Sequence, residues 1–268
     1  MTATGPGTGT RHTARDDPSL LTVIALELGR LRRGFPFWMA LLLPLVLVMP
    51  LGLIAAFSPE GKGGDVWGVW FSVTLLFWGV FQPMGCALYS AMSIRADRDA
   101  RRLLYGYAFP RHRLLTAKYC ALLAVGLASA LLLALLLAAA AAALGGASAV
   151  AEVPGGVLIP WVAGAGTLAL CLFTAEKWGF PVTAAIGVVG MVLAGTVADQ
   201  PFWWAVPPVW PMRAVVPLAG IEASGVPLAP GDPLASTGVL PLVIALSAGL
   251  AAVLVAVAAR HVNRKELS

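Results

Sequence analysis

The residues best suited to chemistry outside the apolar parts of the chain lie between Ser93 and Lys118. This segment carries seven of the eighteen Lys and Arg residues, interleaved with leucine, tyrosine and phenylalanine. Arginine and tyrosine are enriched among the residues that dominate protein–protein binding, so the pattern predicts docking of a partner. Adhesion to anionic lipid is a compatible alternative. The residues expected to make the partner contact are Arg98, Arg101, Arg102, Leu104, Tyr105, Tyr107, Phe109 and Pro110.

Catalytic constellations are missing from the sequence. Asp97 and Asp99 are surrounded by arginines, which suits solvated ion pairs better than acid–base catalysis. No HExxH, GxSxG or GxxxxGK[ST] motif occurs. The sequence therefore indicates neither the zinc site of a metalloprotease, nor the nucleophile turn of a serine hydrolase, nor a phosphate-binding loop. The three cysteines form no pattern typical of a disulfide or a metal site. We expect no catalytic residues, no metal and no cofactor in this chain, and any ATP and Mg to bind a separate chain.

A second segment of interest runs from Asp199 to Thr237 and is rich in proline and tryptophan. Indole rings favour the depth of the lipid headgroups, so this segment is expected to lie at the outer membrane interface. It either anchors a connecting loop or faces a substrate, and it can dip into the membrane only where protein covers its backbone. The residues expected to face a substrate are Trp203, Trp204, Trp210, Pro211 and Arg213.

Membrane helices must position both segments. The mean hydropathy is +0.85, and only 12% of residues are charged, about half the share of a soluble domain. Six apolar runs have membrane-spanning length. The sequence therefore predicts an all-α, polytopic membrane protein with six transmembrane helices. The runs are Phe37–Phe57, Gly68–Ala91, Tyr119–Leu144, Val157–Phe173, Phe180–Ala198 and Gly238–Ala259.

The distribution of basic residues predicts the orientation of these spans. Sixteen Lys and Arg residues lie on one side of the predicted topology, and only Lys62 and Arg213 lie on the other. Cytoplasmic loops retain positive charge, so both termini are expected in the cytoplasm of a multi-pass protein of the cell membrane. The span interiors hold no ionisable residue, which argues against an ion-coupled transporter. Their main polar interruption, Gln82–Pro83, favours a helix kink over a ligand contact.

Shorter segments complete the predicted organisation. Residues 18–34 have helical apolar spacing at Leu20, Val23, Ile24, Leu28 and Leu31, which predicts an amphipathic helix in the cytoplasmic interface; an early start of the first span is the alternative. The remaining predictions are a disordered leader (1–17), an outer loop at Gly145–Gly156, a tight cytoplasmic turn at Thr174–Gly179, a six-span domain (35–260, with its cytoplasmic loop at 93–118 and its outer segment at 199–237) and a cytoplasmic tail (261–268).

Three stretches carry a resemblance to a known family: LELGRLRRG before the first span, RADRDARRLLYGYAFPRHRLLTAK between the second and third, and PPVWPMRAVVPLAGIEASGVPL before the last. In these, the chain resembles permease subunits of type-2 ABC exporters, and among them the lantibiotic-immunity permeases. One departure is the pair Arg101–Arg102, near which relatives often have a tryptophan.

The resemblance implies a dimer with a second permease copy or a paralogue, and two copies of a separate ABC ATPase. The loop at 93–118 would insert into a cleft of that ATPase. The substrate would be a peptide bacteriocin, expelled from the membrane to give self-immunity. Two alternatives stay open: an exporter of a drug or lipophilic metabolite, and a membrane sensor or scaffold that does not transport. The expected partners are thus the ATPase, a second permease, lipid and peptide, with no nucleic acid.

Overall fold

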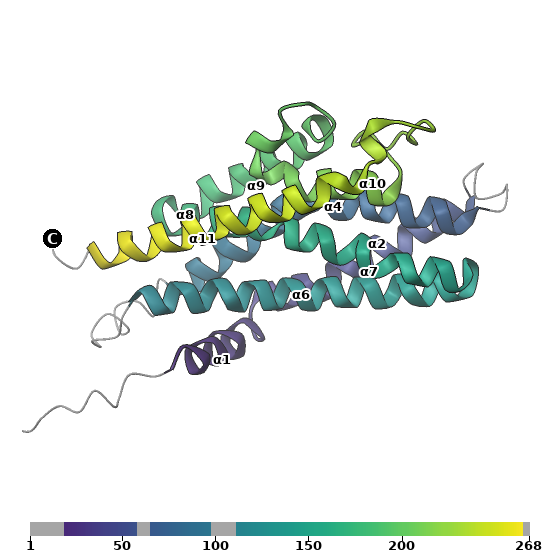
Figure 1. The fold of residues 1–268 in the computed structure, drawn as a ribbon. Coiled ribbons are helices and arrows are strands. Elements are labelled where there is room, and N and C mark those ends of the chain that lie inside the picture. Colours follow the sequence, from purple (N-terminus) through teal and green to yellow (C-terminus); the bar gives the residue numbers. More distant parts are fainter. Residues whose placement is uncertain (1–18, 58–64, 98–110, 265–268) are drawn as a thin grey trace, which may run out of the picture.

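The computed structural model describes residues 19–57, 65–97 and 111–264, and these residues fold as a bundle of helices (Figure 1). Within the described ranges the only β-type pairing is a single bridge between Ile221 and Pro227. The predicted leader, the centre of the predicted cytoplasmic loop and the last residues of the tail lie outside the described residues.

In the part of the chain that the structure describes, six helices are long and apolar enough to cross a membrane, which confirms the predicted number of spans and the all-α class. The same residues also form two shorter helices, α1 and α10, and four 3-10 turns. The spans are α2 (Phe35–Phe57), α4 (Val66–Asp97), α6 (Arg111–Leu144), α7 (Gly146–Ala163) with α8 (Ala165–Trp178), α9 (Phe180–Val197) and α11 (Leu240–Arg264). The shorter elements are α1 (Leu20–Leu31), α10 (Trp210–Ala219), η1 (Trp203–Ala205), η2 (Pro207–Val209), η3 (Pro233–Ala235) and η4 (Thr237–Val239).

The fourth span corrects the sequence prediction. The residues predicted as an outer loop, Gly145–Gly156, belong almost entirely to α7, which begins at Gly146. Their small side chains and single acid, Glu152, suggested a loop. Helix α7 packs along α6 and α10, and this tertiary packing outweighs the weak helix propensity of its glycines and proline. The turn between α6 and α7 needs only Gly145 and Gly146, the latter with φ of 78°, a conformation that glycine adopts without strain.

The loops at the other end of the bundle are also shorter than predicted. Helix α4 continues to Asp97 and α6 begins at Arg111, so both flanks of the predicted loop at 93–118 are helical. Helix α8 continues to Trp178, and Gly179, with φ of 80°, makes the predicted tight turn into α9.

The two ends of the bundle differ in character (Figure 1). Helix α1, the last turn of α4, the start of α6 and the C-terminal end of α11 lie at one end, and α10 lies toward the other. We call the first the basic end, because it carries Arg30, Arg95, Lys118, Lys177 and Arg260. Each half of the bundle has its own apolar cluster, one around Leu75 and Met212 and one around Leu122 and Leu172.

Candidate functional sites at the two ends of the bundle

The face of helix α1 that packs against the bundle includes a carboxylate. Its buried residues are Val23, Glu27 and Leu31, which recur every four residues and so form one stripe. Glu27 is only 3% exposed although it is a carboxylate. The helix starts at Ser19, whose hydroxyl accepts a hydrogen bond from the Thr22 backbone N–H at 3.2 Å, a standard N-cap that fixes this end of the helix.

The buried carboxylate of Glu27 meets a buried lysine from the third span. Lys118, 2% exposed, donates from Nζ to Glu27 Oε2 at 2.8 Å and to Ser93 Oγ at 3.1 Å. Arg30 donates to the other carboxylate oxygen at 2.9 Å. We call Glu27, Lys118 and Ser93 the buried junction. It joins α1 to the last turns of α4 and the first turns of α6.

Apolar packing reinforces the buried junction. Leu31 of α1, Ile94 of α4 and Leu115 of α6 belong to one buried cluster beside it. Removing one partner of a buried ion pair typically costs about 3–5 kcal/mol, because the other charge is left buried without its counterion. The helices that flank residues 98–110 are therefore held to α1 by both charge and packing, and the three cannot shift independently without breaking this contact.

The eight residues predicted to bind a partner all fall between residues 98 and 110, outside the described residues. The structure shows how the two helices that flank these residues, α4 and α6, are attached to α1. Glu27 was not among the residues that the sequence analysis singled out. Its spacing of four from both Val23 and Leu31 was the available signal that it shares their buried face.

The outer segment is deeply built into the bundle. Helix α10 packs between α4 and α7, and Met212 and Val215 lie fully buried against Gly79, near the middle of α4. A Cβ on Gly79 would come within 3.0 Å of both side chains, so only glycine allows this approach. The Ser72 and Thr167 hydroxyls donate to backbone carbonyls of the segment at 2.9 Å each. Protein thus covers α10, as a dip into the membrane requires, whereas most residues from Val226 to Thr237 are exposed.

The predicted substrate-facing residues separate by exposure. Trp210 is 4% exposed, and its indole N–H donates to the Trp204 carbonyl at 3.1 Å. Pro211 and Arg213 are also buried, and Trp203 is half-buried. Trp204 is 58% exposed. The structure therefore does not bring the five side chains to one open surface, and of the five only Trp204 is mainly exposed.

Arg213 forms an electrostatic centre inside the outer segment. Its guanidinium lies 5.8 Å from the ring centre of Trp203, within the range of a cation–π contact. Burial lowers the pKa of Arg213, and the attraction of Asp199 and Asp232 opposes that shift. Burial likewise raises the pKa of Asp199, against the hydrogen bond that its carboxylate accepts from the Ala223 N–H at 2.7 Å. The hydrogen bond from Ala223 to Asp199 thus links the turn after α10 to the start of the segment.

A break in the fourth span lies close to this segment. Helix α7 ends at Ala163 and α8 begins at Ala165, with Gly164 between them. Ser247 of α11 donates to the Val162 carbonyl at 3.1 Å and accepts from the Gly166 N–H at 2.8 Å. Tyr119 of α6 donates to the Ala165 carbonyl at 3.1 Å. Side chains of other spans thus satisfy the backbone groups that the break frees.

Comparison with known proteins gives no match: neither a family model, nor a curated protein, nor a solved structure matches this chain. Among the described residues, no three of His, Cys, Asp and Glu gather as a metal site requires. The buried junction, the exposed Trp204 and the arrangement of six spans are therefore the features on which a function must be argued.

Proposed function

We propose that this chain is the permease subunit of an ATP-driven ABC exporter and that its basic end docks a separate ATPase. The observation that carries the proposal is the buried junction. Lys118 binds Glu27 and Ser93 at once, so a force applied to residues 98–110 acts on α1, α4 and α6 as one body. The sequence has no phosphate loop of its own, so the energy for such a force must come from a partner.

The transport cycle follows from this linkage. The ATPase would grip residues between Arg98 and Pro110, and its opening and closing would displace the flanking helices together with α1. A second permease, identical or paralogous, would complete the path across the membrane. An even number of spans and a concentration of basic residues at one end support the placement of that end in the cytoplasm.

For the substrate we propose a peptide bacteriocin, taken from the outer leaflet and expelled so that the cell is immune. Trp204 and Phe202, 58% and 53% exposed, supply apolar contact area in the outer segment, where an amphiphilic peptide partitions. An exporter of a drug or lipophilic metabolite would share the same ATPase, whereas a sensor or scaffold would have none.

The experiment that tests the proposal places a photo-crosslinking amino acid at Tyr105 in the membrane-embedded chain. We expect a covalent adduct with a Walker-type ATPase, identified by mass spectrometry, and no such adduct from the same probe at Trp204. In the reconstituted complex, Tyr105→Asp should abolish substrate-stimulated ATP hydrolysis, and Tyr105→Phe should retain it. Crosslinks to lipid alone, or full stimulation in Tyr105→Asp, would refute the docking assignment.

A further inference from the structure

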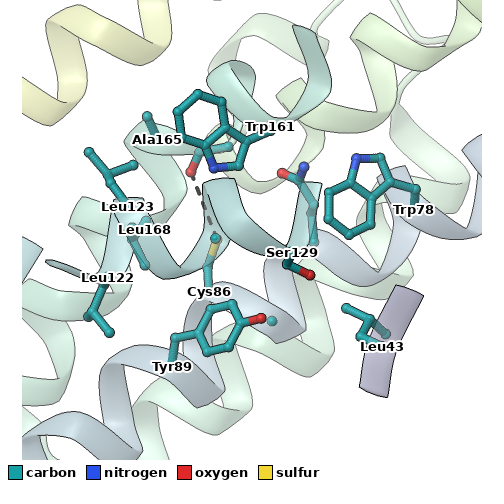
Figure 2. A pocket seen from close by; sticks show the side chains of 14 residues that line it. Leu43, Trp78, Cys86, Tyr89, Leu122, Leu123, Ser129, Trp161, Ala165 and Leu168 are labelled. Carbon is teal, nitrogen blue, oxygen red and sulfur yellow. Dashed lines mark hydrogen bonds between the residues drawn. The ribbon is translucent and has the colours of Figure 1, made fainter. Parts of the chain in front are cut away.

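A cavity lies in the middle of the bundle, between α2, α4, α6 and the break in the fourth span (Figure 2). It is half open rather than sealed, and the space that a ligand group can enter is about 40 Å³. Each water molecule needs ~10–15 Å³ by this kind of measure, so the cavity has room for about three waters or a polar group of similar size.

Three polar side chains of this cavity lack a well-formed hydrogen bond. Gln82, Tyr89 and Ser129 are 8%, 7% and 1% exposed, and all three line the cavity. Gln82 Nε2 has no hydrogen-bond partner among the described residues. The hydroxyls of Tyr89 and Ser129 lie close enough to interact with each other, but no hydrogen bond of standard geometry joins them. Figure 2 shows Tyr89 and Ser129 directed into the space below Trp161 and beside Leu43.

Burying these polar groups without well-formed hydrogen bonds costs free energy. A buried polar group without a hydrogen bond costs about 1–3 kcal/mol, and the hydrocarbon layer offers no bulk water to relieve it. One such group is explained by local packing. An unpaired amide N–H beside two hydroxyls that make no well-formed hydrogen bond indicates instead that a bound partner completes the set. Gly164 leaves room for the Gln82 carboxamide, because a Cβ there would collide with Gln82 Oε1.

The lining defines the chemistry of that partner. Of the described residues that line the cavity, none is charged, so the ligand is uncharged. Gln82 Nε2 can only donate, while the two hydroxyls donate or accept, so the ligand group must carry an oxygen with free lone pairs. The remaining wall is apolar, with Trp78 and Trp161 on it. A small polar head with an apolar body fits this combination.

We propose that this cavity binds the hydroxyl or carbonyl head of an uncharged lipophilic molecule from the bilayer, with Gln82, Tyr89 and Ser129 as its hydrogen-bonding residues. The apolar body of the ligand leaves through the open side, because the cavity holds only the head. This assignment does not depend on a partner ATPase. It also gives the Gln82–Pro83 interruption a role beyond a kink in α4.

The test uses the purified full chain in detergent micelles and two bromine-bearing probes of equal length. The tryptophans Trp78 and Trp161 line the cavity, so a bromine held there quenches part of the intrinsic fluorescence. We expect 2-bromo-1-undecanol, whose bromine lies on the carbon next to the hydroxyl-bearing carbon, to give a saturable quenching component. We expect 1-bromoundecane, which lacks the hydroxyl, to give none. Gln82→Leu and Tyr89→Phe should each weaken alcohol binding about five- to tenfold, as expected for one lost hydrogen bond.

Ser90→Ala is the matched control. Its hydroxyl is likewise buried and unpartnered on α4, but it does not line the cavity, so alcohol binding should stay unchanged. Tyr89→Phe removes one oxygen atom and preserves packing, so it still tests the proposal if Gln82→Leu misfolds. Circular dichroism checks the fold of both variants. Equal quenching by the two probes, or wild-type affinity in Tyr89→Phe and Gln82→Leu, would overturn the proposal and leave a cavity that holds water only.

Discussion

At the scale of single residues, exposure separates the tryptophans of the outer segment into different roles. Trp204 is 58% exposed and Trp210 is 4% exposed. If the proposed substrate is correct, Trp204→Ala lowers resistance of the cell to the bacteriocin several-fold without lowering Tm, because it removes exposed surface and nothing in the core. Trp210→Ala should instead destabilise the protein by about 3–5 kcal/mol, as for other buried aromatic residues. Minimum inhibitory concentrations and thermal melts in detergent measure the two effects.

The matched control is Trp38→Ala. Trp38 is 57% exposed but lies at the start of α2, at the basic end of the bundle. It should leave both resistance and Tm unchanged. If Trp38→Ala and Trp204→Ala reduce resistance equally, the outer segment has no special contact with the substrate.

The burial of individual residues was only partly predictable from the sequence. Apolar spacing in residues 18–34 predicted a helix, and α1 is one. Val23 and Leu31 of the predicted apolar set are buried, whereas Leu20 of that set is exposed and Glu27, outside the set, is buried. A carboxylate is buried only when a partner compensates it, and that partner, Lys118, is 91 residues away. Pattern reasoning within one helix cannot see such a partner.

At the scale of elements, the buried junction makes α1 part of the bundle. We predict that Glu27→Gln destabilises the protein by about 3–5 kcal/mol, since the buried Lys118 ammonium loses the carboxylate that it contacts. For a chain of this size that loss lowers Tm by on the order of 10 °C. The double variant Glu27→Gln/Lys118→Met removes both charges and should recover most of the loss. Thermal melts of the wild type, both single variants and the double variant give the coupling energy.

The double variant also tests how the junction works. Because its side chains no longer form an ion pair, α1 should separate from α4 and α6 more readily even where stability is restored. Additive losses in the four-way comparison would show that Glu27 and Lys118 do not depend on each other. Arg95→Gln, an exposed change on α4, should leave Tm unaffected and serves as the reference.

Some boundaries of the helices could not be predicted from the sequence. Apolar runs located all six spans, but the fourth was predicted to begin at Val157, after a stretch of small residues that contains Glu152. Gly156 is small for a packing reason: a Cβ there would lie 2.7 Å from Phe71 Cζ. Glycine that permits close helix contact and glycine that ends a helix look alike in one sequence. The break at Gly164, by contrast, left no clear composition signal in the run from Val157 to Phe173.

At the scale of the whole molecule, the two ends of the bundle differ both in charge and in the elements that they carry. Helix α1, the buried junction and the basic residues lie at one end, while α10 and its surrounding 3-10 turns lie toward the other (Figure 1). The proposed function needs both asymmetries at once. The ATPase must meet the basic end, and the substrate must meet the outer segment, so the bundle has to stand in the membrane with the basic end in the cytoplasm.

This orientation can be measured with single cysteines in intact cells. Ser224 in the outer segment and Ala96 at the end of α4 are both exposed. We predict that a membrane-impermeant maleimide labels Ser224→Cys in intact cells, and that it labels Ala96→Cys only after the membrane is permeabilised. The unsubstituted chain is the control, because its three cysteines lie within helices of the bundle. The reverse pattern would place the basic end outside, against the charge rule, and docking of a cytoplasmic ATPase would then be impossible.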